Sequence, residues 1–123
     1  MFRQRFVRGV TFRQAQAYLE KTLLENVSGR SPSRLERMRA LLDELGDPQL
    51  AYRAVHVAGT SGKGSTCTMI ADVLQSAGLN VGLHTKPHLH SVTERAKING
   101  IAITSAHFGA LIGEMMPVLD HVA

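Results

Sequence analysis

The sequence predicts an α/β protein organised around a βαβ unit with parallel strands, preceded by two helices. Three observations support this prediction: a short apolar run at 53–58 that enters a glycine-rich turn, an amphipathic pattern from about 64 to 77, and a second apolar run at 80–84. A strand, a helix and a strand in so few residues imply parallel strands and a right-handed crossover. Ligands bind beyond the carboxyl ends of such strands, which directs attention to the glycine turn and to the segment after His84.

The first predicted helix begins at a capping box. Thr11 and Gln14 have the required spacing, and the helical pattern continues to about Val27. One face of this helix holds Ala15, Tyr18, Leu19, Thr22 and Leu23. Residues 1–10, which carry several arginines, are predicted to form a loose basic arm, and residues 11–123 are predicted to form the folded part.

The second predicted helix begins near Ser33, which has capping-box spacing to Glu36. Gly46 is the expected stop, and the following Asp47-Pro48 turns the chain. The apolar face of this helix is predicted to contain Leu35, Met38, Leu41, Leu42 and Leu45. The loop 28–32 separates the two helices.

The glycine-rich turn is the strongest functional signal. It reads Gly59-Thr60-Ser61-Gly62-Lys63-Gly64-Ser65-Thr66 and lies between the first predicted strand, 53–58, and a helix. Glycines allow close backbone approach, and the free N–H groups of a helix start favour a bound phosphate. Lys63 would add a positive charge beside the phosphates, and a hydroxyl from Ser65 or Thr66 could reach Mg²⁺. The pattern departs from the standard phosphate-loop motif, because Gly64 stands where a hydroxyl residue should follow Lys63.

The rest of the chain completes the predicted unit. The helix after the turn should bury one face and end at Gly78; that face holds Met69, Ile70, Val73, Leu74 and Ala77. The second strand covers 80–84, and a polar loop follows at 85–95. Residues 96–103 read as a hairpin with an Asn99-Gly100 type I′ turn. A last helix is capped by Thr104 or Ser105, and its apolar positions are Phe108, Leu111, Ile112, Met115 and Leu119.

Composition limits the functional classes. The net charge of +4 suits a binder of small anions as well as it suits nucleic acid, but aromatic residues make up only 5% and no basic stripe recurs at helical spacing, so we expect no nucleic-acid partner. A single cysteine permits no internal disulfide and fits a reducing compartment. No apolar run reaches membrane-spanning length and the first residues are a poor secretory signal, so the expected location is the cytoplasm.

Several motifs together resemble the folylpolyglutamate synthase/dihydrofolate synthase family, a branch of the Mur ligase superfamily. The segment from Val57 to Ser65 is similar to the family's A-G-T-N-G-K-G-[ST] loop. Thr85-Lys86-Pro87-His88-Leu89 resembles the family's T-S-P-H-L segment, and its E-R and I-N-G motifs follow as Glu94-Arg95 and Ile98-Asn99-Gly100. Leu35-Glu36-Arg37-Met38 is similar to part of a family helix start. The matches keep the family's order over residues 15–112.

The resemblance implies the amino-terminal part of a P-loop-containing, Mur-ligase-type ATPase domain. The implied reaction phosphorylates the carboxylate of a dihydropteroate or folate with ATP, and the amine of L-glutamate then attacks the acyl phosphate. Residues 59–66 would bind ATP, with Lys63 as the catalytic cation and Ser65 as a Mg²⁺ ligand. Pro87, His88, Glu94 and Arg95 would lie on the substrate side, and the loop after Ser28 would border the pterin site. The full-length enzyme is expected to be monomeric.

Two departures from the family accompany this resemblance. The family's magnesium-ligand serine is replaced by Lys86, whose ammonium cannot ligate the ion. Family members are also more than twice as long, so the glutamate-binding domain has no counterpart here and we expect the chain to be inactive alone.

Two other functions stay open: another P-loop hydrolase or kinase, which would need an acidic residue after a later strand, and a non-catalytic nucleotide-binding module. A zinc site at His84, His88 and His90 and a nucleophilic Cys67 are both disfavoured by their surroundings in the sequence.

Overall fold

The computed structural model describes residues 9–25 and 34–122. The chain divides into two compact units. The helical unit comprises the chain up to Arg53 together with Ala106–Ala123, and the turn unit comprises Ala54–Ser105. Residues 1–8 of the predicted basic arm lie outside the described residues.

The helical unit contains α1 (Phe12–Glu25), α2 (Arg34–Glu44), the short 3-10 helix η1 (Pro48–Leu50) and most of α4 (Ser105–Val122). The predicted capping box at the start of α1 is confirmed. The N–H of Thr11 donates to Oε1 of Gln14 at 2.9 Å, and the N–H of Gln14 donates to Oγ1 of Thr11 at 3.3 Å. Ala15 is completely buried, as its place on the predicted core face requires.

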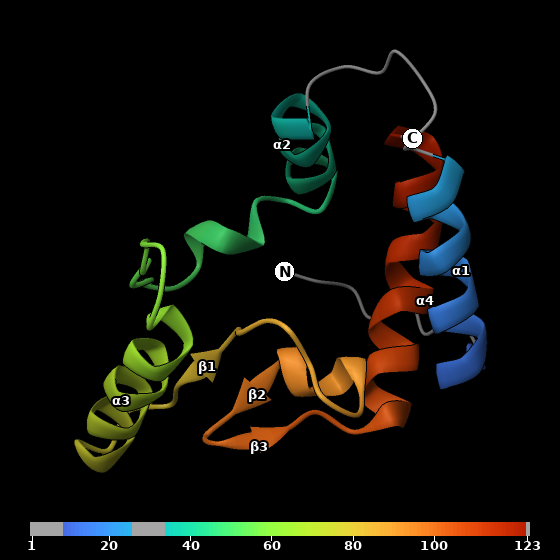
Figure 1. Cartoon of the computed structure of the whole chain (residues 1–123). Coiled ribbons are helices and arrows are strands. Elements are labelled where there is room, and N and C mark those ends of the chain that lie inside the picture. Colours follow the sequence, from blue (N-terminus) through green and yellow to red (C-terminus); the bar gives the residue numbers. More distant parts are fainter. Residues whose placement is uncertain (1–8, 26–33, 123) are drawn as a thin grey trace. The chain divides into compact units, whose positions relative to one another are not determined.

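Helices α1 and α4 lie side by side in the helical unit (Figure 1). The Tyr18 hydroxyl donates to Oδ1 of Asp120 at 2.5 Å, and the rings of Phe12 and Phe108 meet edge to face at 5.5 Å. The buried positions of α4 are Gly109 and Gly113, whereas Leu111 is exposed. Leu111 belongs to the predicted apolar positions but lies outside the packed face, because the α4 backbone packs closely against Val10 at Gly109 and Gly113, where an added Cβ would clash.

Helix α2 ends at the predicted glycine. Gly46 adopts a φ of 76°, its N–H donates to the carbonyl of Asp43, and the N–H of Asp47 donates to the carbonyl of Leu42. These two bonds form a Schellman motif, in which the left-handed conformation favours glycine. Leu35 and Met38 are exposed, which corrects their predicted core positions. The predicted cap Ser33 lies outside the described residues.

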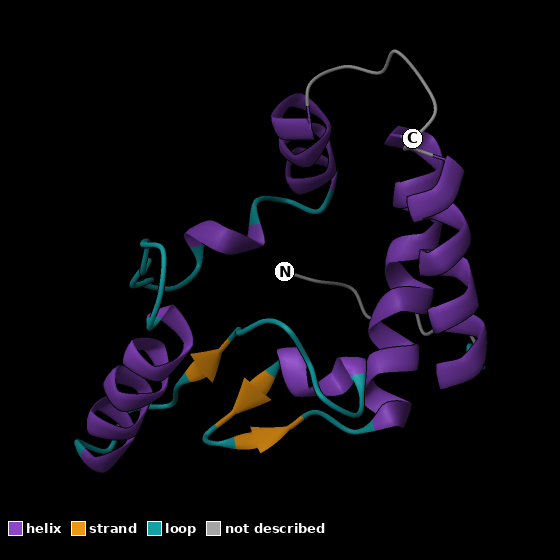
Figure 2. Cartoon of the chain, in the orientation of Figure 1, coloured by secondary structure: helices purple, strands orange, loops and turns teal. Residues whose placement is uncertain are grey.

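The turn unit contains α3 (Lys63–Ser76), β1 (Gly82–Leu83), the 3-10 helix η2 (Val92–Arg95), β2 (Lys97–Ile98) and β3 (Ile101–Ala102). The three strands form an antiparallel sheet in the order β1-β2-β3, drawn in orange in Figure 2. The type I′ turn between β2 and β3 is confirmed, because Asn99 and Gly100 adopt φ values of 49° and 78°. The Asn99 side chain also accepts the N–H of Val81 at 2.8 Å, which joins the hairpin to the segment before β1.

The predicted parallel pairing is not present among the described residues. Residues 53–58 have no strand assignment there, and β1 pairs instead with β2 in antiparallel orientation. The physical reason is that a strand exists only when a neighbour accepts its hydrogen bonds, and the side chain of Val55 is 65% exposed.

Helix α3 begins one residue before the predicted start and ends with Gly78 in the expected left-handed conformation. Its buried side differs from the prediction, since Ala71 is buried while Met69 and Val73 are exposed. Ile70 and Leu74 are half-buried. The sequence periodicity identified the apolar face of α3, but the small sheet of this unit covers only one edge of that face.

Among the described helices none is long and apolar enough to cross a lipid bilayer.

Candidate functional site

The glycine turn 59–66 adopts, at two positions, a backbone conformation that favours glycine. Gly59 and Gly62 adopt φ values of 150° and 73°, a range that disfavours side chains. Gly62 is the N-cap of α3, and no side chain of the described residues caps the helix there. The first N–H groups of the helix therefore stay available to an anion, and the helix dipole adds partial positive charge at the same point.

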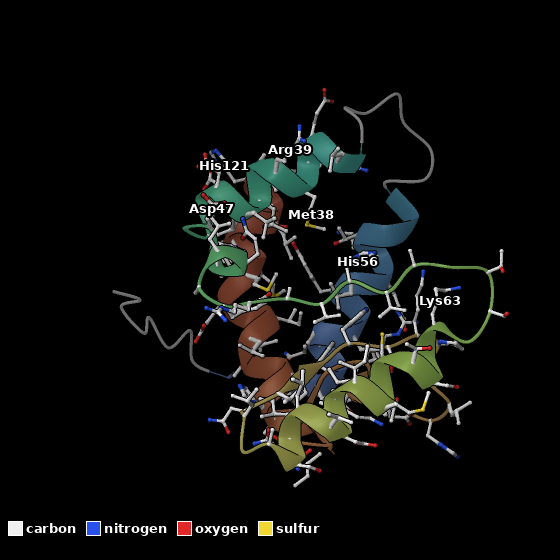
Figure 3. The ribbon with its side chains drawn as sticks, turned by 90° about the vertical axis from the view of Figure 1, so that its left-hand side faces the viewer. Met38, Arg39, Asp47, His56, Lys63 and His121 are labelled. Atoms are coloured by element: carbon white, nitrogen blue, oxygen red, sulfur yellow. The ribbon has the colours of Figure 1, made fainter. Side chains whose placement is uncertain are left out.

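Lys63 occupies the first position of α3, immediately after this turn (Figure 3). Its ammonium donates to the carbonyl of Gly59 at 2.5 Å and to the carbonyl of Thr60 at 3.2 Å. The side chain is thus folded back over the turn in a solvent-exposed position. An ammonium has three donor hydrogens, so a bound phosphate oxygen can take the third without breaking either bond.

The hydroxyl groups near Lys63 differ in their availability. Oγ1 of Thr66 donates to the carbonyl of Gly62 at 2.9 Å, and Oγ1 of Thr68 donates to the carbonyl of Gly64 at 3.0 Å. Ser65 is exposed and makes no side-chain hydrogen bond within residues 9–25 and 34–122. Ser65 and Thr66 are the two residues whose hydroxyls were predicted to reach Mg²⁺. Of these, Ser65 is the one whose hydroxyl makes no hydrogen bond among the described residues and can therefore contact a metal ion.

Glu94, a predicted substrate-side residue, is engaged by its own loop. Its carboxylate accepts the backbone N–H groups of Leu89, His90 and Ser91, each at 2.9 Å. These backbone hydrogen bonds stabilise the ionised form and lower the pKa of Glu94 to about 2. The structure thus gives Glu94 a loop-holding role.

Ser91 is a residue of this loop that our sequence reasoning missed. It is the N-cap of η2 and forms a reciprocal capping box with Glu94. The signal was present in the sequence, since Ser91 and Glu94 have the S-x-x-E spacing of such a box. Thr93 follows two positions after Ser91 and is a buried polar residue of the described part of the chain. Its Oγ1 forms a hydrogen bond of 2.9 Å with Oγ of Ser91.

Arg95 and His88, two more predicted substrate-side residues, contact each other. Nε of Arg95 donates to Nδ1 of His88 at 2.8 Å, and both side chains are half-buried. Pro87 is exposed and follows a cis peptide bond from Lys86, whose side chain is also exposed. Of the four predicted substrate-side residues, His88, Glu94 and Arg95 therefore take part in hydrogen bonds within the 85–95 loop.

No metal cluster of three or more His, Cys, Asp or Glu side chains forms in the part of the chain that the structure describes. His84, His88 and His90 form no such group there. Cys67 is half-buried on α3.

Comparisons with known proteins agree on one group of enzymes. The chain is 46% identical over 86 residues to the dihydrofolate synthase/folylpolyglutamate synthase of Bacillus subtilis (strain 168). The matched region is 70% of this chain and 20% of that protein. The chain is 39% identical over 85 residues to the Mycobacterium tuberculosis protein of the same name, covering 69% of this chain and 18% of that protein. The chain spans about a fifth of the length of these relatives. No family model matches it.

Solved structures lead to the same group. The fold matches the folylpolyglutamate synthetase from Lactobacillus casei with a TM-score of 0.79 and 32% identity, covering 91% of this chain and 27% of that one. It matches the Mycobacterium tuberculosis folylpolyglutamate synthase complexed with ADP with a TM-score of 0.76 and 32% identity, covering 90% and 24%. In sequence and in fold, the chain belongs to the folylpolyglutamate synthase/dihydrofolate synthase family and corresponds to the amino-terminal portion of these Mur-ligase-type proteins.

Proposed function

We propose that this chain is the nucleotide-binding portion of an ATP-dependent ligase that adds L-glutamate to dihydropteroate or a folate through an acyl phosphate. The observation that carries this proposal is the start of α3, where Gly62 in a left-handed conformation leaves the first helical N–H groups uncapped beside Lys63. Relatives support it, because the matched Mycobacterium tuberculosis synthase is complexed with ADP. A folylpolyglutamate synthase complex with AMPPCP and folate also matches this chain, with a TM-score of 0.75 and 32% identity.

The residues of the turn suit phosphoryl transfer. The transferred group carries negative charge on its oxygens, and catalysis consists largely of positioning and charge stabilisation. The N–H groups of residues 60–65 would donate to phosphate oxygens, and Lys63 would place a full positive charge on them. ATP supplies the phosphoryl group, and Mg²⁺, held in part by the free hydroxyl of Ser65, supplies further charge neutralisation.

The 85–95 loop would face the carboxylate substrate. We propose that Pro87 and His88 border that substrate, whereas Glu94 and Arg95 act through the loop, because their side chains already bind Leu89–Ser91 and His88. L-Glutamate is the second substrate in this proposal. The proposal includes no nucleic-acid partner and no membrane. That the enzyme is monomeric and cytoplasmic stays a prediction.

We further propose that this chain binds nucleotide but does not by itself join glutamate to a substrate. The matched portion is about a fifth of each curated relative, so most of the chain of those proteins lies outside the match. The measurement is glutamate-dependent phosphate release by this chain in the presence of ATP and dihydropteroate or folate. Steady release above the background of the Lys63→Ala variant would contradict the proposal.

Titration calorimetry with ATP, in the presence and absence of Mg²⁺, tests the nucleotide site itself. Loss of Lys63 removes a charge-assisted contact worth about 1.5–3 kcal/mol, so Lys63→Ala should weaken binding roughly 10- to 100-fold. Lys21→Ala, in α1 of the other unit, is the matched control and should bind like wild type. Equal affinity of wild type and Lys63→Ala would place the nucleotide elsewhere.

One observation favours a second candidate, a non-catalytic nucleotide-binding module. Lys86 is exposed at the position where the resembling family has a magnesium-ligand serine, and a protonated ammonium repels a divalent cation. Tight ATP binding that is indifferent to Mg²⁺, combined with no ligase or hydrolase activity in any longer form of the protein, would select this candidate.

A further inference from the structure

The contact between Arg95 and His88 determines which imidazole nitrogen carries the proton. A guanidinium has donors only, so Nε of Arg95 must donate to Nδ1 of His88 across the observed 2.8 Å. Nδ1 is therefore the acceptor and carries no hydrogen. The neutral ring must then be the Nε2–H tautomer, with its one N–H on the opposite side from Arg95.

The segment that carries His88 is held in place from inside the loop. Glu94 accepts the N–H groups of three successive residues, 89–91, immediately after His88. The neighbouring Thr93 is buried, and η2 begins in the capping box at Ser91. Each of these contacts lies within the 88–95 segment, so the position of the His88 ring does not depend on a ligand being present.

The remaining nitrogen of His88 has no such partner. Within the described residues Nε2 makes no hydrogen bond, and the side chain is only half-buried, so this N–H can be reached from solvent. The surrounding charge is favourable for an anion. Glu94 is the acidic residue of the 85–95 loop, and its carboxylate is directed at three backbone amides, while Lys86 and Arg95 contribute two positive charges against its one negative charge.

We infer that Arg95 is a positioning residue that holds His88 as a fixed Nε2–H donor to an anionic oxygen of a bound ligand. The inference rests on the proposed function for the identity of that oxygen, which belongs to a nucleotide phosphate or to the carboxylate of the pteroate or folate. A donor fixed before binding requires no reorganisation when the ligand arrives, and this is the condition under which a hydrogen bond contributes most to binding.

The first experiment measures the tautomer without any ligand. Imidazole nitrogen shifts of the ¹⁵N-labelled chain are recorded above the usual titration range of histidine, near pH 8.5. His88 should show a single Nε2–H tautomer, whereas His84, which is exposed and makes no hydrogen bond or ion pair among the described residues, serves as the internal reference for a ring in water. Arg95→Met should convert His88 to the mixture seen for His84. Arg95→Gln retains an N–H donor at the same distance along the side chain and should restore the single tautomer without the charge.

The second experiment identifies the ligand oxygen. Affinities for Mg²⁺-AMPPCP and for dihydropteroate are measured separately on wild type and on two His88 variants. His88→Ala should lower the affinity for the probe that His88 contacts roughly 10- to 100-fold, as expected for loss of a hydrogen bond to a charged group. His88→Gln, whose amide N–H lies near the place of Nε2–H, should recover most of that loss. His90→Gln is the matched control in the same loop and should bind both probes within about twofold of wild type.

The outcomes separate this inference from the proposed function. A loss confined to Mg²⁺-AMPPCP assigns the phosphate, and a loss confined to dihydropteroate assigns the carboxylate. Arg95→Met should reproduce the same selective loss and Arg95→Gln should not. If Lys63→Ala abolishes nucleotide binding but no His88 variant affects either probe, the inference is overturned and the proposed function stands. If Arg95→Gln and Arg95→Met lose affinity equally, Arg95 acts by charge alone and its positioning role is refuted. Failure of the wild-type chain to bind either probe overturns both.

Discussion

Ser91 and Glu94 cap each other within the 85–95 loop. The backbone N–H of Ser91 donates to Oε1 of Glu94 at 2.9 Å, and the backbone N–H of Glu94 donates to the carbonyl of Ser91 at 3.0 Å. Two further amides, of Leu89 and His90, share the same carboxylate. One ionised side chain therefore accepts three successive backbone N–H groups of the segment next to His88.

The first prediction concerns acid. The folded-state pKa of Glu94 is lowered from 4.5 to about 2, so its stabilising effect is fully present above pH 4.5 and is lost as pH falls toward 2. Amide chemical shifts of residues 89–91, followed from pH 7 downward, should move together with a midpoint near pH 2. Glu94→Gln should show displaced amide shifts already at pH 7. A midpoint near 4.5 would mean that the three hydrogen bonds are not maintained in solution.

The second prediction concerns the metal ligand. Among the described residues the hydroxyl of Ser65 has no hydrogen-bond partner, whereas the hydroxyl of Thr68 donates to the carbonyl of Gly64. Ser65→Ala should therefore reduce the gain in ATP affinity that Mg²⁺ provides by about tenfold or more, because a ligand oxygen is removed. Thr68→Val is the matched control and should keep that gain. Calorimetry at fixed ATP with increasing Mg²⁺ measures it, and an unaltered gain in Ser65→Ala would remove Ser65 from the proposed site.

The third prediction concerns Lys86. If its ammonium opposes a metal ion near the bound phosphates, Lys86→Ser should strengthen the Mg²⁺-dependent part of ATP binding by roughly tenfold, about 1.4 kcal/mol. A gain could come from relief of charge repulsion or from the new serine hydroxyl acting as a metal ligand. Lys86→Gln separates these two contributions, because it removes the charge without adding a hydroxyl. A gain in Lys86→Ser but not in Lys86→Gln would indicate a new ligand. Equal gains would indicate relief of repulsion, and no gain in either would show that Lys86 lies away from the metal.

The fourth prediction tests the packing of α4 against the segment before α1. A Cβ on Gly109 would lie 2.5 Å from the carbonyl oxygen of Val10, and backbone atoms cannot move aside as a flexible side chain can. Gly109→Ala should therefore lower the free energy of unfolding by about 1–3 kcal/mol. Gly82→Ala is the control, since no atom lies within 4 Å of its added Cβ and its φ is not in the left-handed range. Urea unfolding followed by circular dichroism compares them, and equal stabilities would contradict this packing.

The candidate site was largely predictable because its parts are close in sequence. The turn 59–66 contains its glycines, its lysine and its hydroxyls within eight positions, so the pattern alone predicts a glycine turn that leads into a helix start, for which phosphate is the proposed ligand. The choice between Ser65 and Thr66 was not predictable. It depends on the Thr66 hydroxyl turning back to the carbonyl of Gly62, one of several rotamers that the sequence permits.

The roles of the 85–95 loop residues were only partly predictable. The sequence placed Glu94 and Arg95 beside the substrate through a resemblance, and the capping spacing of Ser91 went unnoticed. The bond from Arg95 to His88 joins residues seven positions apart through a non-helical path. No periodicity rule covers such a pair, because its geometry is set by the fold of the whole loop.

Local conformations were determined by the sequence alone. The capping box at Thr11, the left-handed Gly46 and Gly78 that end α2 and α3, and the type I′ turn at Asn99-Gly100 all follow from interactions within about six residues. Only the tertiary structure decided that β1 pairs antiparallel with β2, that Ala71 rather than Val73 is buried, and that Gly109 packs on Val10. Hydrogen bonds of short range depend on a few torsion angles, whereas strand pairing and burial depend on which distant surface supplies the missing partner.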